Sequence, residues 1–144
     1  MISVDRKIEL AGITKNLKHF REFTRQCVTQ ADVSEEVAWK LTLAVDEAVT
    51  SIIRSQTVGL KTSQILIQDI ELHIDINEVR FKAVISESEK EFHYDEDDFD
   101  KLLEEAKRLR KYDLSTFMLC RVMDEVNYEF KKGYANQLTV IKFL

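Results

Sequence analysis

The sequence predicts an α/β domain in two layers, in which helices pack on a sheet. Three observations predict this fold class: segments in which polar and apolar residues alternate, longer segments in which apolar residues recur at helical spacing, and two strands with a turn that close the chain. A chain of 144 residues can bury about two thirds of its unfolded surface, so we expect residues 1–144 to form a single domain.

The N-terminal third predicts one strand and two helices. Polar and apolar residues alternate over residues 4–10, which is typical of an edge strand. After Gly12, apolar residues recur at helical spacing to about residue 30. Ser34 is a suitable N-cap for a second helix, because its hydroxyl can accept a backbone N–H bond and two glutamates follow in the first turn. We expect this helix to reach Ser55.

The centre of the chain predicts a hairpin followed by a charged helix. Residues 65–76 and 79–85 alternate in polarity, and Asn77-Glu78 between them favours a tight turn. The acidic residues 94–100 then open a helix with basic residues at its far end, as the helix dipole prefers. That helix is either a solvated amphipathic helix or one that contacts a partner.

The C-terminal part predicts a last helix and a closing hairpin. The helix spans residues 114–124, and the strands 126–131 and 138–143 flank Gly133. The expected apolar face of the helix consists of Leu114, Phe117, Met118, Val122 and Met123.

Composition excludes several classes of protein. The net charge of -5 argues against a direct nucleic-acid binder, which usually has a strongly basic face. The sequence contains neither a secretory signal nor a run of 18 apolar residues, so we expect a cytoplasmic protein without a membrane partner.

Cysteine, histidine and serine give no sign of a metal or nucleophile site. Cys27 and Cys120 lie among apolar residues of predicted helices, and we expect buried thiols rather than a disulfide or a metal pair. His19, His73 and His93 are isolated from other metal ligands, so no metal site is predicted. No serine has the surroundings of a nucleophile elbow.

An acidic pair, Asp46-Glu47, interrupts the otherwise apolar second helix. Glu47 borders the apolar face and shares a polar stripe with Thr50, Ser51 and Arg54, at helical intervals of three and four. A ligand site could lie on this stripe. Alternatively, Glu47 is a carboxylate at the rim of the core that pairs with Arg54 or is solvated.

Two segments resemble one family. They are LTLAVDEAVTSIIRS, residues 41–55, and FMLCRVMDEVNYEFKKGYANQLTVIKFL, residues 117–144. The first is similar to the E-A-V-T-N helix of the anti-sigma factor serine kinases, a branch of the ATPase superfamily that includes histidine kinases and gyrase. The second is similar to the last helix and hairpin of that family, with its M-D-E-V motif. The resemblance implies a mixed, mainly antiparallel sheet with helices packed on one face, the histidine kinase-like ATPase domain.

The resemblance also implies roles for two residues of the second helix. In active members the glutamate at the position of Glu47 polarises a water or hydroxyl as a general base. An asparagine four residues later holds Mg²⁺ through its amide oxygen, and here Ser51 replaces it. A serine hydroxyl is shorter than that amide and lies too far from an unshifted ion.

The nucleotide motifs of the family are altered in this chain. Its D-x-G-x-G-F run, which reads adenine and lets the backbone approach the nucleotide, corresponds to residues 87–92, where Glu87 takes the place of the aspartate and Glu89 and Glu91 replace the glycines. The phosphate-binding G-x-G before the last helix corresponds to Asp113-Leu114-Ser115. Each added carboxylate 4 Å from a phosphate charge costs about 1 kcal/mol in water and about 4 kcal/mol at an effective dielectric of 20.

The resemblance therefore predicts a degenerate relative that binds no cofactor and works by binding protein. Sigma factors and anti-sigma antagonists are the partners that the family implies, and a homodimer is also expected. The alternative is a divergent serine/threonine kinase that uses ATP and Mg²⁺, with Glu47 as the base and with Ser51 and Glu87 at the metal and adenine. A third possibility is a structural or dimerisation module without a switching role.

Overall fold

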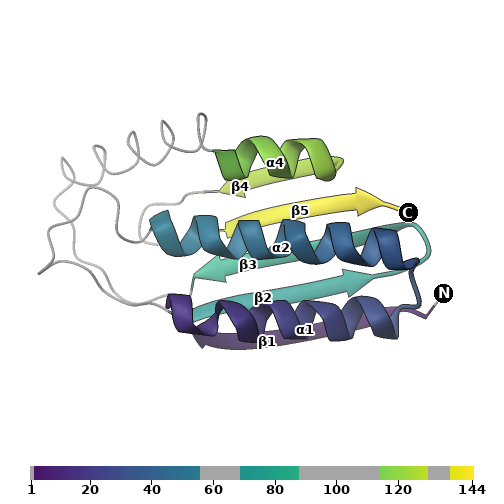
Figure 1. Cartoon of the computed structure of the whole chain (residues 1–144), viewed down its shortest axis with the longest axis horizontal. Coiled ribbons are helices and arrows are strands. Elements are labelled where there is room, and N and C mark those ends of the chain that lie inside the picture. The colour runs from purple at the N-terminus through teal and green to yellow at the C-terminus, as the bar shows by residue number, and fades with distance from the viewer. Residues whose placement is uncertain (1, 56–68, 88–113, 130–136) are drawn as a thin grey trace, which may run out of the picture.

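A computed structural model describes residues 2–55, 69–87, 114–129 and 137–144 (Figure 1). These residues form two layers, a five-stranded sheet and a set of helices that cover one of its faces. The predicted two-layer fold class is confirmed. The expected helix after residues 94–100 and the start of the strand over residues 65–76 lie outside the described residues.

The sheet is antiparallel at every pairing of the described strands. In chain order the strands are β1 (Val4–Ala11), β2 (Asp69–Ile76), β3 (Arg80–Glu87), β4 (Glu125–Glu129) and β5 (Gln137–Phe143). Their order in the sheet is β1-β2-β3-β5-β4, so β1 is an edge strand, as predicted. Val4 pairs with Ile76, and Ile76 pairs in turn with Phe81 on β3.

The helices run along the sheet. A short 3₁₀ turn, Thr14–Asn16, leads into α1 (Leu17–Gln30), and α2 (Glu35–Ser55) and α4 (Leu114–Val122) follow. Figure 1 shows α1 over β1 and β2, α2 over β3 and β5, and α4 beside β4. Ser34 caps α2 as predicted, because its Oγ accepts a hydrogen bond from the Val37 N–H at 3.4 Å. None of the helices in the described part is both long and apolar enough to span a membrane.

The core lies between the helices and the sheet. Buried and half-buried residues alternate along the whole of β2 and β3, as the period of a strand requires. The largest fully buried side chains are Phe20, Phe81, Leu41, Ile52, Ile70, Leu72, Ile74, Ile76, Ile85, Val28, Val45 and Val49. Burying each of them contributes about 1.5–3 kcal/mol relative to exposure.

The turn between β2 and β3 confirms the predicted hairpin. The Asn77 side-chain oxygen accepts hydrogen bonds from the backbone N–H groups of Val79 and Arg80, both at 2.9 Å. An asparagine side chain bonded in this way takes the place of a backbone turn bond. Within the hairpin, the side chain of His73 on β2 contacts the Asp5 carboxylate on the neighbouring strand β1.

One predicted buried cysteine is exposed. Cys27 is buried, and burial raises the pKa of its thiol, although Arg6 nearby lowers it to a lesser extent. Cys120 is exposed, so the prediction of a buried thiol there was wrong. Leu119 on α4 and Met123 directly after the helix are buried, and the next position after Leu119 is rotated by about 100° around the helix, toward solvent.

Asp124 joins the end of α4 to the last strand. Its Oδ2 accepts a hydrogen bond from the Phe143 backbone N–H at 2.7 Å, and its Oδ1 lies 3.3 Å from Lys142 Nζ. The hydrogen bond from Phe143, with a smaller contribution from Lys142, lowers the pKa of the Asp124 carboxyl. The aspartate of the M-D-E-V motif therefore has a structural role.

We expect Asp124→Ala to lower the free energy of unfolding at pH 7, because Phe143 N–H loses its acceptor. A folded-state pKa below the unfolded value of about 3.9 stabilises the fold above that pH, and this stabilisation is lost as pH falls through the folded pKa. The gap between the urea midpoints of wild type and Asp124→Ala should therefore shrink below about pH 4. Asp124→Asn keeps an acceptor without the charge and should lie between them; equal midpoints at pH 7 would contradict the assignment.

Candidate functional site

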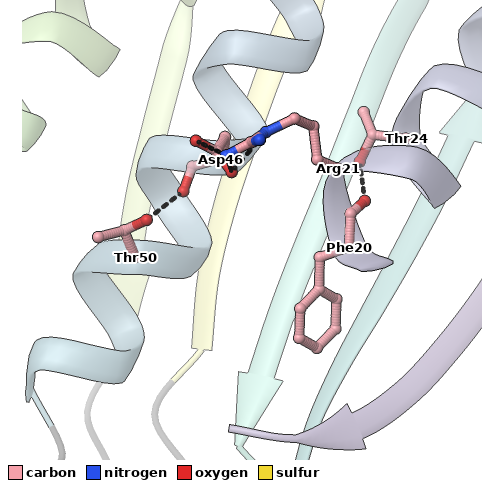
Figure 2. A network of polar contacts seen from close by, with 5 residues as sticks. All are labelled: Phe20, Arg21, Thr24, Asp46 and Thr50. Carbon is pink, nitrogen blue, oxygen red and sulfur yellow. Dashed lines mark hydrogen bonds and ion pairs between the residues drawn. The ribbon is translucent and has the colours of Figure 1, made fainter. Parts of the chain in front are cut away.

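The two carboxylates of α2 lie on different flanks of the helix. Asp46 faces α1, where Arg21 reaches across to it (Figure 2). Adjacent residues of a helix are rotated by about 100°, so Glu47 lies away from that contact. The acidic pair is therefore two separate features, and only Glu47 belongs to the predicted site.

Arg21 holds Asp46 through three hydrogen bonds. Its Nη2 lies 3.1 Å from Oδ1 and 3.2 Å from Oδ2 of Asp46, and its Nε lies 3.3 Å from Oδ1. The Asp46 side chain is only 18% exposed, and the Arg21 side chain is 49% exposed. An ion pair in this setting contributes about 0.5–1 kcal/mol. Thr50 lies one turn further on and donates to the Asp46 carbonyl, which leaves the carboxylate to Arg21 (Figure 2).

This contact was not predicted from the sequence, because Arg21 and Asp46 are 25 positions apart on separate helices. The pair adds a polar contact between α1 and α2, which also pack through buried apolar side chains.

Glu47 and Ser51 lie on the flank of α2 that is turned away from α1. Figure 1 places α2 between α1 and α4, and α2 contacts both. Glu47 is half-buried, as its predicted place beside the apolar face requires. Ser51, one turn later, is only 7% exposed. Along the polar stripe of α2, burial therefore increases from Glu47 to Ser51.

Glu87 is the last residue of β3 and is 7% exposed. Figure 1 shows that β3 and α2 end, and α4 begins, at the same end of the molecule. The fold therefore brings together at that end the elements that carry Glu47, Ser51 and Glu87. The sequence analysis assigned these three residues to one site. In the sequence, Glu87 lies 40 positions after Glu47 and 36 positions after Ser51 (87 − 47 and 87 − 51).

The other predicted site residues are not described in the same detail. Glu89, Glu91 and Asp113 lie outside the described residues. Ser115 falls in the first turn of α4, but its side chain is outside the described part, as is that of Arg54. The pairing of Glu47 with Arg54 stays a prediction.

A protein-family comparison identifies the domain. A family model described as the histidine kinase-like ATPase domain matches residues 12–142. The chain belongs to this family. Curated proteins give no match to the sequence. The match begins directly after β1 and covers all the described helices, β2, β3, β4 and β5 up to its last residue but one, so these helices and strands of Figure 1 are those of a histidine kinase-like ATPase domain.

ATP and Mg²⁺ are the groups that this family implies, and of the predicted ligand positions the structure describes Ser51, which does not fit the ion. Magnesium prefers several oxygen ligands in octahedral geometry. Among the described residues, no group of three or more His, Cys, Asp or Glu side chains could hold a metal ion. The hydroxyl that stands in for the asparagine belongs to Ser51, whose side chain is nearly buried against the core.

Proposed function

We propose that this histidine kinase-like ATPase domain is a regulatory protein of the anti-sigma type, which binds no ATP and acts by binding another protein. One observation carries the proposal. Where the anti-sigma kinases have the glycines that approach the nucleotide, this chain has Glu89, Glu91, Asp113 and Ser115. A triphosphate needs bare backbone N–H groups and no neighbouring anion.

The partner is expected to be a sigma factor or an anti-sigma antagonist, because these are the proteins bound by the anti-sigma factor serine kinases, which the sequence resembles. We further propose that the protein works in the cytoplasm and that two copies form a dimer. Without a nucleotide cycle, binding would be controlled by the concentration of the partner or by its modification.

A divergent serine/threonine kinase is the second candidate. Glu47 favours it, since this half-buried carboxylate on α2 stands at the position of the general base in the resembling family. Three altered motifs would have to be compensated together for this function, so we place it second.

Titration with Mg-ATP tests the proposal. We expect calorimetry to detect no binding at 1 mM Mg-ATP, because the acidic substitutions repel the phosphates. Wild type, Glu47→Ala and Glu47→Gln should then give the same flat trace. Micromolar binding by the wild type that Glu47→Ala abolishes would support the kinase instead. A denatured sample is excluded by checking that all three proteins unfold cooperatively.

A further inference from the structure

The sheet has two edge strands, β1 and β4, which lie at its opposite borders (Figure 1). β1 is 8 residues long and β4 is 5 residues long. Among the described strands, none pairs with the outer edge of either. An edge strand presents a row of backbone N–H and C=O groups to which another chain can pair. The side chains on each edge decide which chain that is.

The apolar side chains of β1 are less completely covered than those of its neighbour. Ile8 and Leu10 are half-buried and pack against the rim of the core. They pair with Leu72 and Ile70 of β2, which are fully buried. An apolar row that crosses the sheet therefore reaches the free edge, where a further strand would remove it from water.

The outer face of β1 carries an unfavourable charge contact. Glu9 lies directly opposite Glu71 on β2, and like charges at such positions are destabilising. The ladder holds a second pair of this kind, Asp5 and Asp75, but there Arg80 lies 3.7 Å from Asp75. Within the described part of the chain, neither Glu9 nor Glu71 forms an ion pair. A cation supplied at the free edge would relieve this contact.

The sequence of β1 is complementary in charge to itself. Residues directly opposite one another in an antiparallel pair point to the same face of the sheet. When two copies pair through β1 about a two-fold axis at Ile8, Lys7 of each copy lies opposite Glu9 of the other. Each Glu9 thereby gains the cation that β2 does not provide, and the two Ile8 side chains cover each other on the inner face.

Other registers of β1 bring like charges together. An axis at Lys7 sets Lys7 against its own copy and Asp5 against Glu9, and an axis at Glu9 sets two glutamates against each other. An axis at Arg6 pairs Lys7 with Asp5 but places two arginines opposite each other. Of the axes at residues 6 to 10, that at Ile8 alone pairs opposite charges without also pairing like charges.

The other edge, β4, does not favour a second copy. Its exposed residues are Glu125, Asn127 and Glu129. An antiparallel pair of two β4 strands about Asn127 sets Glu125 against Glu129, and no residue of β4 is a cation that another register could place opposite a glutamate. Of the two edges, only β1 therefore suits pairing with its own copy.

We propose that two copies of this chain pair antiparallel through β1, with the two-fold axis at Ile8 and two reciprocal ion pairs between Lys7 and Glu9. The axis is perpendicular to the sheet, so the helices of both copies cover the same face of one continuous sheet. Each copy contributes the same patch, as in most two-fold dimers. The inference rests on the dimer in the proposed function, to which it assigns a surface.

Cross-linking through Ile8→Cys locates the axis. Opposite residues of an antiparallel pair have Cα atoms about 4.5–5.5 Å apart, which is within the range of a disulfide. In a Cys120→Ser background, which removes the exposed thiol, we expect mild oxidation to convert the Ile8→Cys variant into a covalent dimer. Leu10→Cys is the matched control, because its two copies would lie about 14 Å apart along the strands. Cross-linking of Leu10→Cys as efficient as that of Ile8→Cys would overturn this register.

Charge reversal, followed by sedimentation equilibrium, tests the ion pairs. We expect Lys7→Glu and Glu9→Lys each to weaken dimerisation about tenfold at low salt, and by less at about 0.5 M NaCl, because each sets like charges opposite each other. The double variant restores opposite charges and should dimerise about as tightly as the wild type. Glu125→Lys, on the other edge, should leave the affinity unchanged. A double variant no tighter than the single ones would overturn the reciprocal pairs.

The remaining outcomes separate this interface from the proposed function. A dimer whose affinity none of the β1 variants changes uses another surface, which overturns the interface and leaves the dimer in place. A wild type that stays monomeric at about 0.1 mM overturns both the interface and the dimer, even where a strand of a different protein is found on β1. Neither result bears on the loss of ATP binding, which the Mg-ATP titration decides separately.

Discussion

Phe81→Ala is expected to lower the free energy of unfolding by about 3–5 kcal/mol. The Phe81 side chain is fully buried on β3, where it pairs with Ile76 and lies under the helices. Removing the ring leaves a cavity that the surrounding side chains fill only in part. Since small domains are stable by about 5–15 kcal/mol, this one substitution removes a large share of the total. Urea unfolding with an unchanged m-value measures the loss.

Val79→Ala is the matched control for Phe81→Ala. Val79 lies two residues earlier, in the turn before β3, and is 65% exposed. Its truncation should change the free energy of unfolding by no more than about 0.5 kcal/mol. If the two variants lost equal stability, the face of β3 that packs against the helices would have been assigned wrongly.

Restoring the nucleotide motifs is expected to create ATP binding. The restored variant carries Ser51→Asn, Glu89→Gly, Glu91→Gly, Asp113→Gly and Ser115→Gly. It removes three carboxylates, each of which costs about 1–4 kcal/mol beside a phosphate charge, so Mg-ATP affinity should rise at least about a hundredfold. At a hundredfold excess of ATP over Kd the stabilisation is about 2.7 kcal/mol, which raises the Tm by roughly 5–10 °C.

A charge-neutral variant separates repulsion from bulk. Glu89→Gln, Glu91→Gln and Asp113→Asn together remove the negative charges but keep the side chains. We expect this variant to bind Mg-ATP more weakly than the restored one, because backbone approach to the nucleotide needs glycine. If the wild type already raised its Tm with Mg-ATP as much as the restored variant, the proposal of a protein that binds no ATP would be refuted.

The strands and the first two helices could be predicted because their patterns are unambiguous. Buried and half-buried residues alternate without exception along β2 and β3, and Asn77 supplies the turn between them. On α2, the apolar positions form one narrow face that the sheet covers. Such patterns leave one arrangement that buries the apolar side chains.

The orientation of α4 could not be predicted in the same way. Its sequence, LSTFMLCRV, is apolar at most positions, so helical spacing selects no single face. The expected face therefore omitted Leu119, which is buried, and Cys120 was wrongly expected in the core. Only packing against α2 and β4 decides which side of such a helix is covered.

The candidate site could be predicted in its residues but not in its surroundings. Helical spacing placed Glu47 at the border of the core, and the structure agrees. That the adjacent Asp46 turns to the other flank and meets Arg21 depends on how two helices pack. Sequence patterns describe one helix at a time, so they contain no information on this contact between α1 and α2.

The pairing of Val4 with Ile76 determines when the first strand can dock. A ribosome adding 5–20 residues per second needs about 4–14 s to make the roughly 70 residues between the two partners. Helix formation takes only about a microsecond, but isolated helices are marginally stable in water, so α1 and α2 gain most of their stability only when the sheet exists to cover them. During those seconds the apolar faces around Phe20 and Val45 are open to other chains. The strand that is made first must therefore wait until β2, its neighbour in the sheet, has been made.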